Sequence, residues 1–259
     1  MLLAFDIGNT NIKLGLYDGE HLAAYWRIST ERHKLTDEYA VIVLNLLRQR
    51  NITLDQINGC AISCVVPPLS SVFLDLARTY LAVEPVVLGP GVKTGMRLLI
   101  DTPRELGADR VANSFAAFRR YGGPTIAIAF GTATAFDVVS AEGDYIGGAI
   151  APGVGIASEA LFRAAAKLYQ VELVKPPHVI GKNTVHYMQS GIVLGYTGLV
   201  EGLVTRMWKE LGARATVVAT GGMAEVIAEV IAGETHVIDH IVPYLTLEGL
   251  RLIYELNAA

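Results

Sequence analysis

The sequence predicts an α/β protein made of two duplicated domains, at residues 1–118 and 119–259. A pattern of strand, glycine-threonine turn, strand, turn and strand opens near Met1 and recurs near Pro124. Helical patterns follow both copies, and internal repetition on this scale indicates duplicated domains. A length of 259 residues suits two modest domains, and 52% hydrophobic residues supply enough apolar material for two cores.

Composition and charge exclude several classes of protein. A formal net charge of -4 and the lack of any Lys/Arg run argue against bulk nucleic-acid binding, which needs basic patches. No apolar stretch is long enough to span a bilayer. The apolar N-terminal run is broken at Asp6 and no basic residues precede it, so we expect no signal peptide and no membrane association.

The two cysteines are expected to be buried, inert thiols. Cys60 and Cys64 lie four residues apart in a predicted strand, so their α-carbons would be ~13 Å apart, too far for a disulfide. A metal site would need further Cys or His partners at suitable spacing, and the neighbouring sequence has none. This usage suits a reducing cytoplasm.

The first hairpin carries a phosphate-binding pattern at its tip, Asp6-Ile7-Gly8-Asn9-Thr10, between predicted strands Met1–Phe5 and Ile12–Gly19. Gly8 permits close backbone approach to a ligand, Asn9 and Thr10 offer hydrogen-bond groups, and Lys13 offers a compact positive charge. The Asp6 carboxylate would repel a polyphosphate unless a cation lay between them, which implies Mg²⁺. The alternative is a polar β-turn without function, in which Asp, Gly and Asn are also common.

The first half then alternates strands and helices. Thr36 is expected to cap the helix that follows it. Gly89–Gly95 looks like a Walker loop, but Lys93 follows Val92 instead of a glycine, so we expect an ordinary loop. The other predicted elements are a strand at His21–Ile28, a strand at Gly59–Val66, a helix at Val72–Tyr80 and a short strand at Glu84–Leu88.

Gly107-Ala108-Asp109-Arg110 opens a helix predicted to run to about Tyr121. Phosphoryl transfer needs a group near the acceptor hydroxyl that can take its proton, and Asp109, beside a cation at a helix start, suits that role. Arg110 can hold a substrate carboxylate through two parallel hydrogen bonds. A surface ion pair or a helix N-cap is the alternative interpretation of this dipeptide.

The second half repeats the device with the turn Gly131-Thr132-Ala133-Thr134. Aligning Gly8 with Gly131 places Ala129 opposite Asp6, so this copy lacks the carboxylate. We expect Thr132 to contact the phosphates from the other side of a cleft. The predicted strands around the turn are Pro124–Ala129, Ala135–Val139 and Tyr145–Ile150.

The later elements complete the second domain. A glycine-rich turn at Gly153-Val154-Gly155 is predicted to open a helix through about Tyr169. Thr220-Gly221-Gly222 is well placed to approach a nucleotide, although a strand-to-helix turn without function fits equally. His236 and His240 are expected to be solvated or packed. The remaining elements are a linker from Pro176, a long helix at Thr184–Leu211, a strand at Ala215–Ala219 and a last helix at Thr246–Leu256.

Two such hairpins, one per half, are typical of the sugar kinase, heat-shock ATPase and actin superfamily, and the whole chain resembles the type III pantothenate kinases within it. The resemblance implies two duplicated ribonuclease-H-like domains of the actin-like ATPase fold with a nucleotide cleft between them. It implies a homodimer that uses ATP with Mg²⁺ to phosphorylate pantothenate to 4'-phosphopantothenate, the first step of coenzyme A biosynthesis. The motifs that carry it are the hairpin Asp6–Thr10 with Lys13, Gly107–Arg110, Gly131–Thr134, Gly147–Gly153 and Asn183-Thr184.

The resemblance also assigns residues to roles, with Asp109 as the catalytic base and Asp6 holding Mg²⁺ through the phosphates. The nucleotide-binding positions it implies are Asp6, Ile7, Gly8, Asn9, Thr10, Asn11, Ile12, Lys13 and Thr132. The pantothenate-binding positions it implies are Gly107, Ala108, Asp109, Arg110, Thr184 and Ile100.

Two departures from the relatives matter. Relatives usually carry Asp where this chain has Ala129, and that carboxylate helps to bind a monovalent cation such as K⁺ or NH₄⁺. A methyl group cannot coordinate a cation, so we expect weakened or absent K⁺ dependence. Relatives often place Tyr where this chain has Ile100, which can pack on pantothenate but cannot donate a phenolic hydrogen bond. The alternatives are a nucleotide-binding regulatory protein that has lost turnover, and a kinase for another small hydroxy acid.

Overall fold

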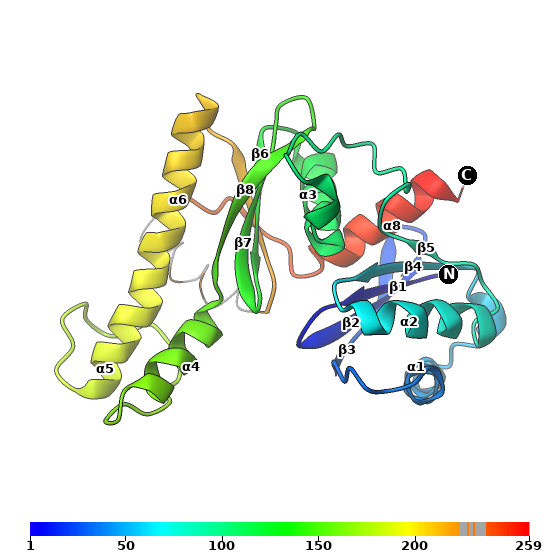
Figure 1. Ribbon diagram of the computed structural model, residues 1–259, viewed down its shortest axis with the longest axis horizontal. Helices are drawn as coiled ribbons and strands as arrows, with labels where there is room; N and C mark the ends of the chain where they lie inside the picture. Colours follow the sequence, from blue (N-terminus) through cyan, green and yellow to red (C-terminus); the bar gives the residue numbers. More distant parts are fainter. Residues whose placement is uncertain (223–226, 228–229, 231–236, 259) are drawn as a thin grey trace. The chain divides into compact units, whose positions relative to one another are not determined.

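The structure is a computed structural model that describes residues 1–222, 227, 230 and 237–258. The chain forms two compact units (Figure 1). Unit 1 contains Met1–Met96, Asp101–Ala116 and the C-terminal residues from Leu245, and unit 2 contains Arg97–Ile100 and Ala117–Tyr244. The division at 116/117 lies two residues from the predicted boundary at 118/119, and the last helix is grouped with the first unit.

Unit 1 is built on a mixed sheet, which among the described residues has five strands in the order β3-β2-β1-β4-β5. Strands β1 to β3 form an antiparallel meander, and β4 and β5 run parallel to β1. Alternate residues of β1, namely Leu3, Phe5 and Ile7, are fully buried in the core with apolar residues of α1 and α2. The strands are β1 (Leu2–Ile7), β2 (Asn11–Asp18), β3 (His21–Ser29), β4 (Gly59–Cys64) and β5 (Val86–Val87), and the helices are α1 (Thr36–Gln49) and α2 (Pro67–Thr79).

The opposite face of this sheet carries α8 (Leu245–Asn257), which contacts β1, β2 and β4. Gly15 and Gly59 allow that approach, because a Cβ at Gly59 would lie 2.3 Å from the Tyr254 hydroxyl and one at Gly15 would lie 3.0 Å from Leu247. Asp6 and Lys13 lie on this face of the sheet, because Leu3, Phe5 and Ile7 alternate with them toward the core.

Unit 2 repeats the topology of unit 1. Its described strands have the order β10-β9-β6-β7-β8, which matches β5-β4-β1-β2-β3 position by position, including the antiparallel meander and the parallel neighbour of the first strand. The predicted duplicated α/β fold is therefore confirmed. The strands are β6 (Thr125–Phe130), β7 (Ala133–Val139), β8 (Tyr145–Pro152), β9 (Thr216–Thr220) and β10 (His240–Ile241).

The core of unit 2 forms between this sheet and α6 (Gly195–Leu211). Ile126, Ile128 and Phe136 of the sheet share one buried cluster with Val200 and Val204 of α6. Figure 1 shows α6, α4 (Val154–Ala164) and α5 (Thr184–Gln189) together beside the sheet. One further helix, α3 (Ala108–Tyr121), begins in unit 1 and ends in unit 2. Short 3₁₀ turns lie at Leu54–Gln56 and Pro103–Glu105.

Several predicted details are wrong or lie outside the described residues. The predicted helix at Thr184–Leu211 is confirmed as one unbroken helical segment, although Ser190–Leu194 within it, between α5 and α6, is π-helical. Thr36 is the first residue of α1 and not its cap, because the Leu35 amide before it donates to the Glu38 carboxylate at 2.9 Å. The helix from Val154 ends at Ala164, before Tyr169, because Ala165 takes an extended conformation.

Some predictions for the C-terminal part of the chain fall within the described residues and others do not. His240 stacks on the Tyr121 ring with centroids 4.0 Å apart, as a packed histidine would, whereas His236 lies outside the described residues. Thr220 ends β9 as predicted, and the helix expected after Gly222 also lies outside the described part.

Among the residues that are described, no helix combines the length and apolarity needed to cross a membrane.

Candidate functional site

The tip of the β1–β2 hairpin is held by a network of hydrogen bonds. The Gly8 amide donates to the Asn11 carbonyl at 3.1 Å and closes the turn. Thr30, just after β3, donates its hydroxyl to the Gly8 carbonyl at 2.7 Å and its amide to the Thr10 carbonyl at 3.0 Å. Arg32 donates to the Asn9 side-chain oxygen at 3.0 Å. The tip is therefore fixed in shape while Asn9 and Thr10 remain exposed.

Behind the tip, Asp6 and Lys13 form a partly buried ion pair. They are direct partners in the antiparallel β1–β2 register, and Lys13 Nζ lies 3.0 Å from Asp6 Oδ2. Burial by itself lowers the pKa of Lys13, but the charge and hydrogen bond of Asp6 raise it above the ordinary value of 10.5. Lys13 is therefore a permanent cation at neutral pH.

The two isoleucines of the hairpin have their side chains in the core. Ile7 and Ile12 are fully buried and belong to the apolar cluster of unit 1. Any contact they make with a phosphate therefore goes through their backbone, unlike contacts from the exposed Asn9 and Thr10.

The structure brings Asp109 into the same electrostatic cluster. Asp109 lies in the first turn of α3, and its charge makes a smaller contribution to raising the pKa of Lys13, after those of Asp6 and Tyr25. Gly107 leaves room for this carboxylate, because a Cβ there would lie 2.6 Å from Asp109 Oδ1. Thus Asp6, Lys13 and Asp109, which come from a hairpin and a helix almost a hundred residues later, share one part of unit 1. Ala108 and Arg110 flank Asp109 and are half-buried.

In unit 2 the second predicted loop is also rigid. The Gly131 amide donates to the Ala133 carbonyl at 3.0 Å, and the Gly153 amide donates to the Thr132 carbonyl at 3.0 Å. A Cβ at Gly153 would lie 2.2 Å from the Gly131 carbonyl oxygen and 2.4 Å from that of Thr132, so only glycine permits this approach. The exposed residue Thr132 is thereby held at the N-terminus of α4.

Ala129 lies half-buried near the end of β6 and pairs with Ala135 on β7 and Thr220 on β9. Neither alanine side chain has an oxygen that could bind a cation. The site therefore lacks a carboxylate at the position aligned with Asp6 and at its neighbour on β7.

The two other predicted acceptor contacts also lie in unit 2. Ile100 lies beside Gly147 of β8, because a Cβ at Gly147 would be 4.0 Å from Ile100 Cγ2. Thr184 is the first residue of α5, and Asn183 caps that helix by accepting the His186 amide at 2.9 Å.

Sequence reasoning missed residues that support the site from outside its motifs. Thr30 and Arg32 lie in a polar, basic stretch between His21–Ile28 and Thr36, which carries no recognisable motif. Arg97 and Asp144 form a bidentate pair across 47 residues of sequence, and no local pattern marks either of them. The only local signal is that Glu142-Gly143-Asp144 has the composition of a turn, which does not identify Asp144 as a partner of Arg97.

The site suits Mg²⁺ held mainly by phosphates. The described residues contain no group of three His, Cys, Asp or Glu side chains that could hold a metal ion alone. Mg²⁺ usually binds through one or two carboxylates together with substrate phosphates, so the single buried carboxylate of Asp6 at the hairpin is the expected donor set.

Comparison with known proteins places the chain among kinases. The family model for type III pantothenate kinase matches residues 2–206. A type III pantothenate kinase of a Roseiflexus species is 65% identical over 99% of both chains, and that of Moorella thermoacetica is 51% identical over 99% of this chain and 100% of its own.

Solved structures with low sequence identity share the fold. Component A of (R)-2-hydroxyglutaryl-CoA dehydratase from Acidaminococcus fermentans matches with a TM-score of 0.58 at 14% identity, over 100% of this chain and 99% of its own. Inorganic polyphosphate/ATP-glucomannokinase from an Arthrobacter species matches with a TM-score of 0.52 at 13% identity, over 99% and 98%. At these identities the likeness concerns the fold alone.

Proposed function

This chain belongs to the type III pantothenate kinase family, and on that premise we propose how its residues divide the work of phosphorylating pantothenate. The reaction belongs to coenzyme A biosynthesis. In our proposal the phosphoryl donor is ATP with Mg²⁺, and the hairpin Gly8–Thr10, Asn11 and Lys13 hold its phosphates together with Thr132. Ile7 and Ile12 take part through their backbone.

Phosphoryl transfer depends on positioning and on neutralising charge. Mg²⁺ held by Asp6 through the phosphates would supply the Lewis acid that neutralises charge on the transferred group. Lys13, fixed by Asp6 at 3.0 Å, adds a positive charge that persists at neutral pH. The hydrogen bonds from Thr30 and Arg32 keep the hairpin in one shape, so little reorganisation is needed when ATP binds.

The observation that carries the proposal is the shared electrostatic cluster of Asp6, Lys13 and Asp109. It supports Asp109 as the candidate base, because the cation that we propose to bind the phosphates lies within its electrostatic reach. In our proposal Asp109 takes the proton of the primary hydroxyl of pantothenate as that oxygen attacks the γ-phosphorus, whose bond to the bridging oxygen breaks so that ADP leaves. Arg110 binds the pantothenate carboxylate, and Gly107, Ala108, Ile100 and Thr184 line the rest of the acceptor site.

We further propose a homodimer that works in the cytoplasm and does not need a monovalent cation. The proposal on the cation rests on Ala129 and Ala135, whose methyl groups offer no ligand.

An assay of the purified protein with ATP, Mg²⁺ and pantothenate tests the proposed function. We expect equal amounts of ADP and phosphopantothenate, with no ADP when the acceptor is left out. Nucleotide binding without ADP formation would overturn the proposal in favour of a regulatory protein. Faster turnover with another small hydroxy acid in an acceptor screen would overturn the choice of substrate.

A further inference from the structure

The segment Arg97–Ile100 is a short piece of chain attached to the edge of the unit 2 sheet. The residues on either side of it belong to unit 1, but these four are grouped with unit 2. Leu98 forms a parallel bridge with Tyr145 at the start of β8. The Leu99 amide donates to the Tyr145 carbonyl at 2.8 Å, and the Tyr145 amide donates to the Arg97 carbonyl at 2.9 Å. These hydrogen bonds fix the register of the segment against β8.

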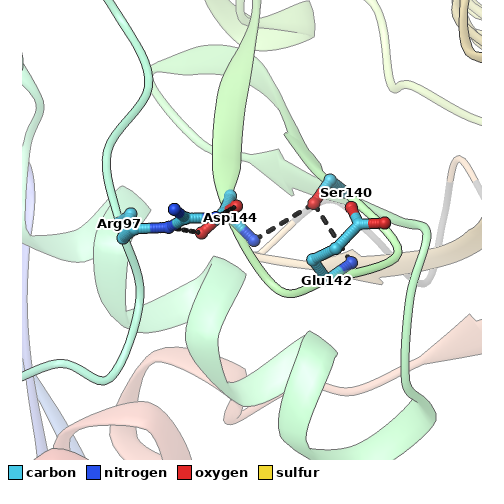
Figure 2. A network of polar contacts seen from close by, with 4 residues as sticks. All are labelled: Arg97, Ser140, Glu142 and Asp144. Carbon is cyan, nitrogen blue, oxygen red and sulfur yellow. Dashed lines mark hydrogen bonds and ion pairs between the residues drawn. The ribbon is translucent and has the colours of Figure 1, made fainter.

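A side-chain pair reinforces this attachment at the segment's first residue (Figure 2). Arg97 donates from Nε to Asp144 Oδ1 at 2.7 Å and from Nη2 to Asp144 Oδ2, which is a bidentate geometry. The Asp144 side chain is 10% exposed, whereas that of Arg97 is 74% exposed. The guanidinium therefore covers a buried carboxylate from the solvent side.

The turn that contains Asp144 is fixed by hydrogen bonds of its own. The Ser140 hydroxyl oxygen accepts the amides of Glu142 at 3.2 Å and Asp144 at 3.3 Å, so the turn before β8 has one shape (Figure 2). The next residue, Tyr145, donates its hydroxyl to Asp137 Oδ1 on β7 at 2.8 Å in the buried interior. The Asp144 carboxylate, which accepts the two hydrogen bonds from Arg97, is thus part of a rigid sheet edge.

The last residue of the segment is Ile100, which is a predicted pantothenate contact. Ile100 lies three residues after Arg97 and beside Gly147 of β8. Gly147 has φ +127°, a conformation that side chains rarely adopt, so the strand presents a bare backbone surface at this point. The Ile100 side chain therefore lies against the backbone of Gly147, at a position that depends on how the segment is attached.

We propose that Arg97 and Asp144 are positioning residues for acceptor binding, which hold Ile100 at the place where it packs on pantothenate. This inference rests on the proposed function and on the acceptor contact of Ile100. Because the guanidinium and carboxylate planes must align for two parallel hydrogen bonds, the pair restricts the orientation of the segment as well as its distance from β8.

The role differs from a contribution to global stability. An ion pair with one highly exposed partner contributes little to unfolding free energy in water. Its loss should therefore loosen the four-residue segment and leave both sheets folded. The exposed pair Arg78–Glu84, bidentate at 2.9 and 2.6 Å, offers a matched control in unit 1 with no link to the acceptor site.

Steady-state kinetics of Arg97→Ala, with pantothenate and ATP varied separately, test the inference. We expect the KM for pantothenate to rise roughly 3- to 10-fold, while kcat and the KM for ATP stay at wild-type values. Ile100→Ala should raise the same KM, and Arg78→Ala should change none of the three constants. The double variant Arg97→Asp with Asp144→Arg, which reverses the pair, should recover part of the loss.

Each other outcome counts against the inference. An active wild-type enzyme with an unchanged pantothenate KM in Arg97→Ala or in Ile100→Ala would overturn it and leave the proposed function standing. Equal rises in both KM values together with a lowered melting temperature would overturn it in favour of a structural role. A wild-type protein without pantothenate kinase activity would overturn the proposed function first and this inference with it.

Discussion

At the scale of single residues, the arrangement around Lys13 links binding to chemistry. One ammonium group is paired with Asp6 and also lies within the electrostatic reach of Asp109. The same cation can therefore hold a phosphate near the carboxylate that we propose as the base. This division of labour predicts different defects for the two acids, with Asp6 affecting nucleotide binding and Asp109 affecting turnover.

Asp109→Asn should lower kcat by about 10²-fold or more, because an amide cannot accept the proton of the acceptor hydroxyl. The KM for ATP should change little, since the hairpin residues are untouched. Steady-state rates with saturating ATP and pantothenate provide the measurement. Asp55→Asn, a change at an exposed carboxylate in the 3₁₀ turn of unit 1, serves as the control. Wild-type kcat in Asp109→Asn would remove this residue from the role of base.

Ala129 predicts an enzyme whose rate does not depend on K⁺. Its methyl group and that of Ala135 lie side by side on β6 and β7, where no oxygen of either side chain can replace the hydration of a cation. Rates in K⁺, NH₄⁺, Na⁺ or a bulky organic cation should be equal at fixed ionic strength. Strong K⁺ activation of the wild type would contradict this prediction.

At the scale of elements, the second loop depends on its contact with the start of α4. Gly153 is buried against the carbonyl oxygens of Gly131 and Thr132, with an ordinary φ of −67°, so only space and not backbone strain demands glycine. Two residues later, Gly155 has no atom within 4 Å of an added Cβ. The two glycines therefore form a matched pair for testing the loop.

Gly153→Ala should displace Thr132 and raise the KM for ATP roughly tenfold or more, because small displacements of positioning groups are costly in phosphoryl transfer. Gly155→Ala should leave the kinetics unchanged and slightly raise the melting temperature, since alanine is favoured over glycine within a helix. Kinetics and thermal unfolding of both variants provide the comparison. Equal ATP KM values in the two variants would show that the contact with Gly153 does not position the loop.

The ion pair between Arg97 and Asp144 at the start of β8 predicts how the stability of the folded protein changes with pH. Hydrogen bonds from Arg97 lower the pKa of Asp144 below its ordinary value of 3.8, although burial opposes the shift. A group whose pKa is lower in the folded state adds stability above its unfolded pKa and loses it as the pH falls through the folded pKa.

Urea midpoints of the wild type and Asp144→Asn should therefore differ by a small, constant amount from pH 7 to about 5, and this small difference should shrink below about pH 4. Added salt should reduce the difference at pH 7, because Arg97 is exposed to solvent. A difference that persists unchanged to pH 3 would show that the carboxylate charge is not what stabilises this edge.

At the scale of the whole molecule, the sequence allowed the two repeated sheets to be predicted well. Apolar runs such as Thr125–Phe130 have few alternatives to a buried strand, and a tight hairpin leaves Lys13 opposite Asp6 almost by necessity. Other features depend on tertiary packing. The pair Arg97–Asp144 could be predicted only by knowing that β8 is an open edge of its sheet. The π-helical turn at Ser190–Leu194 depends on the residues that the helix packs against. Pantothenate itself was predicted from family resemblance, because no residue type specifies it.

The expected homodimer needs an apolar surface, and unit 2 has one. Val179, Ile180 and Tyr187 are exposed, and they lie near one another because the Ser190 hydroxyl donates to the Val179 carbonyl at 2.6 Å while Gly181 packs against Tyr187. Clustered exposed apolar side chains commonly mark interaction surfaces. We therefore expect these three residues to be covered by the partner subunit.

Light scattering after size exclusion should give twice the mass of one chain for the wild type. Ile180→Glu should shift the protein toward the mass of one chain, because a charge buried in an apolar interface without a partner is strongly unfavourable. Leu54→Glu, at an exposed leucine of unit 1, should leave the dimer intact. If the Ile180→Glu monomer also loses affinity for pantothenate but not for ATP, then acceptor binding depends on the assembled pair. A wild-type monomer at assay concentrations would contradict both expectations.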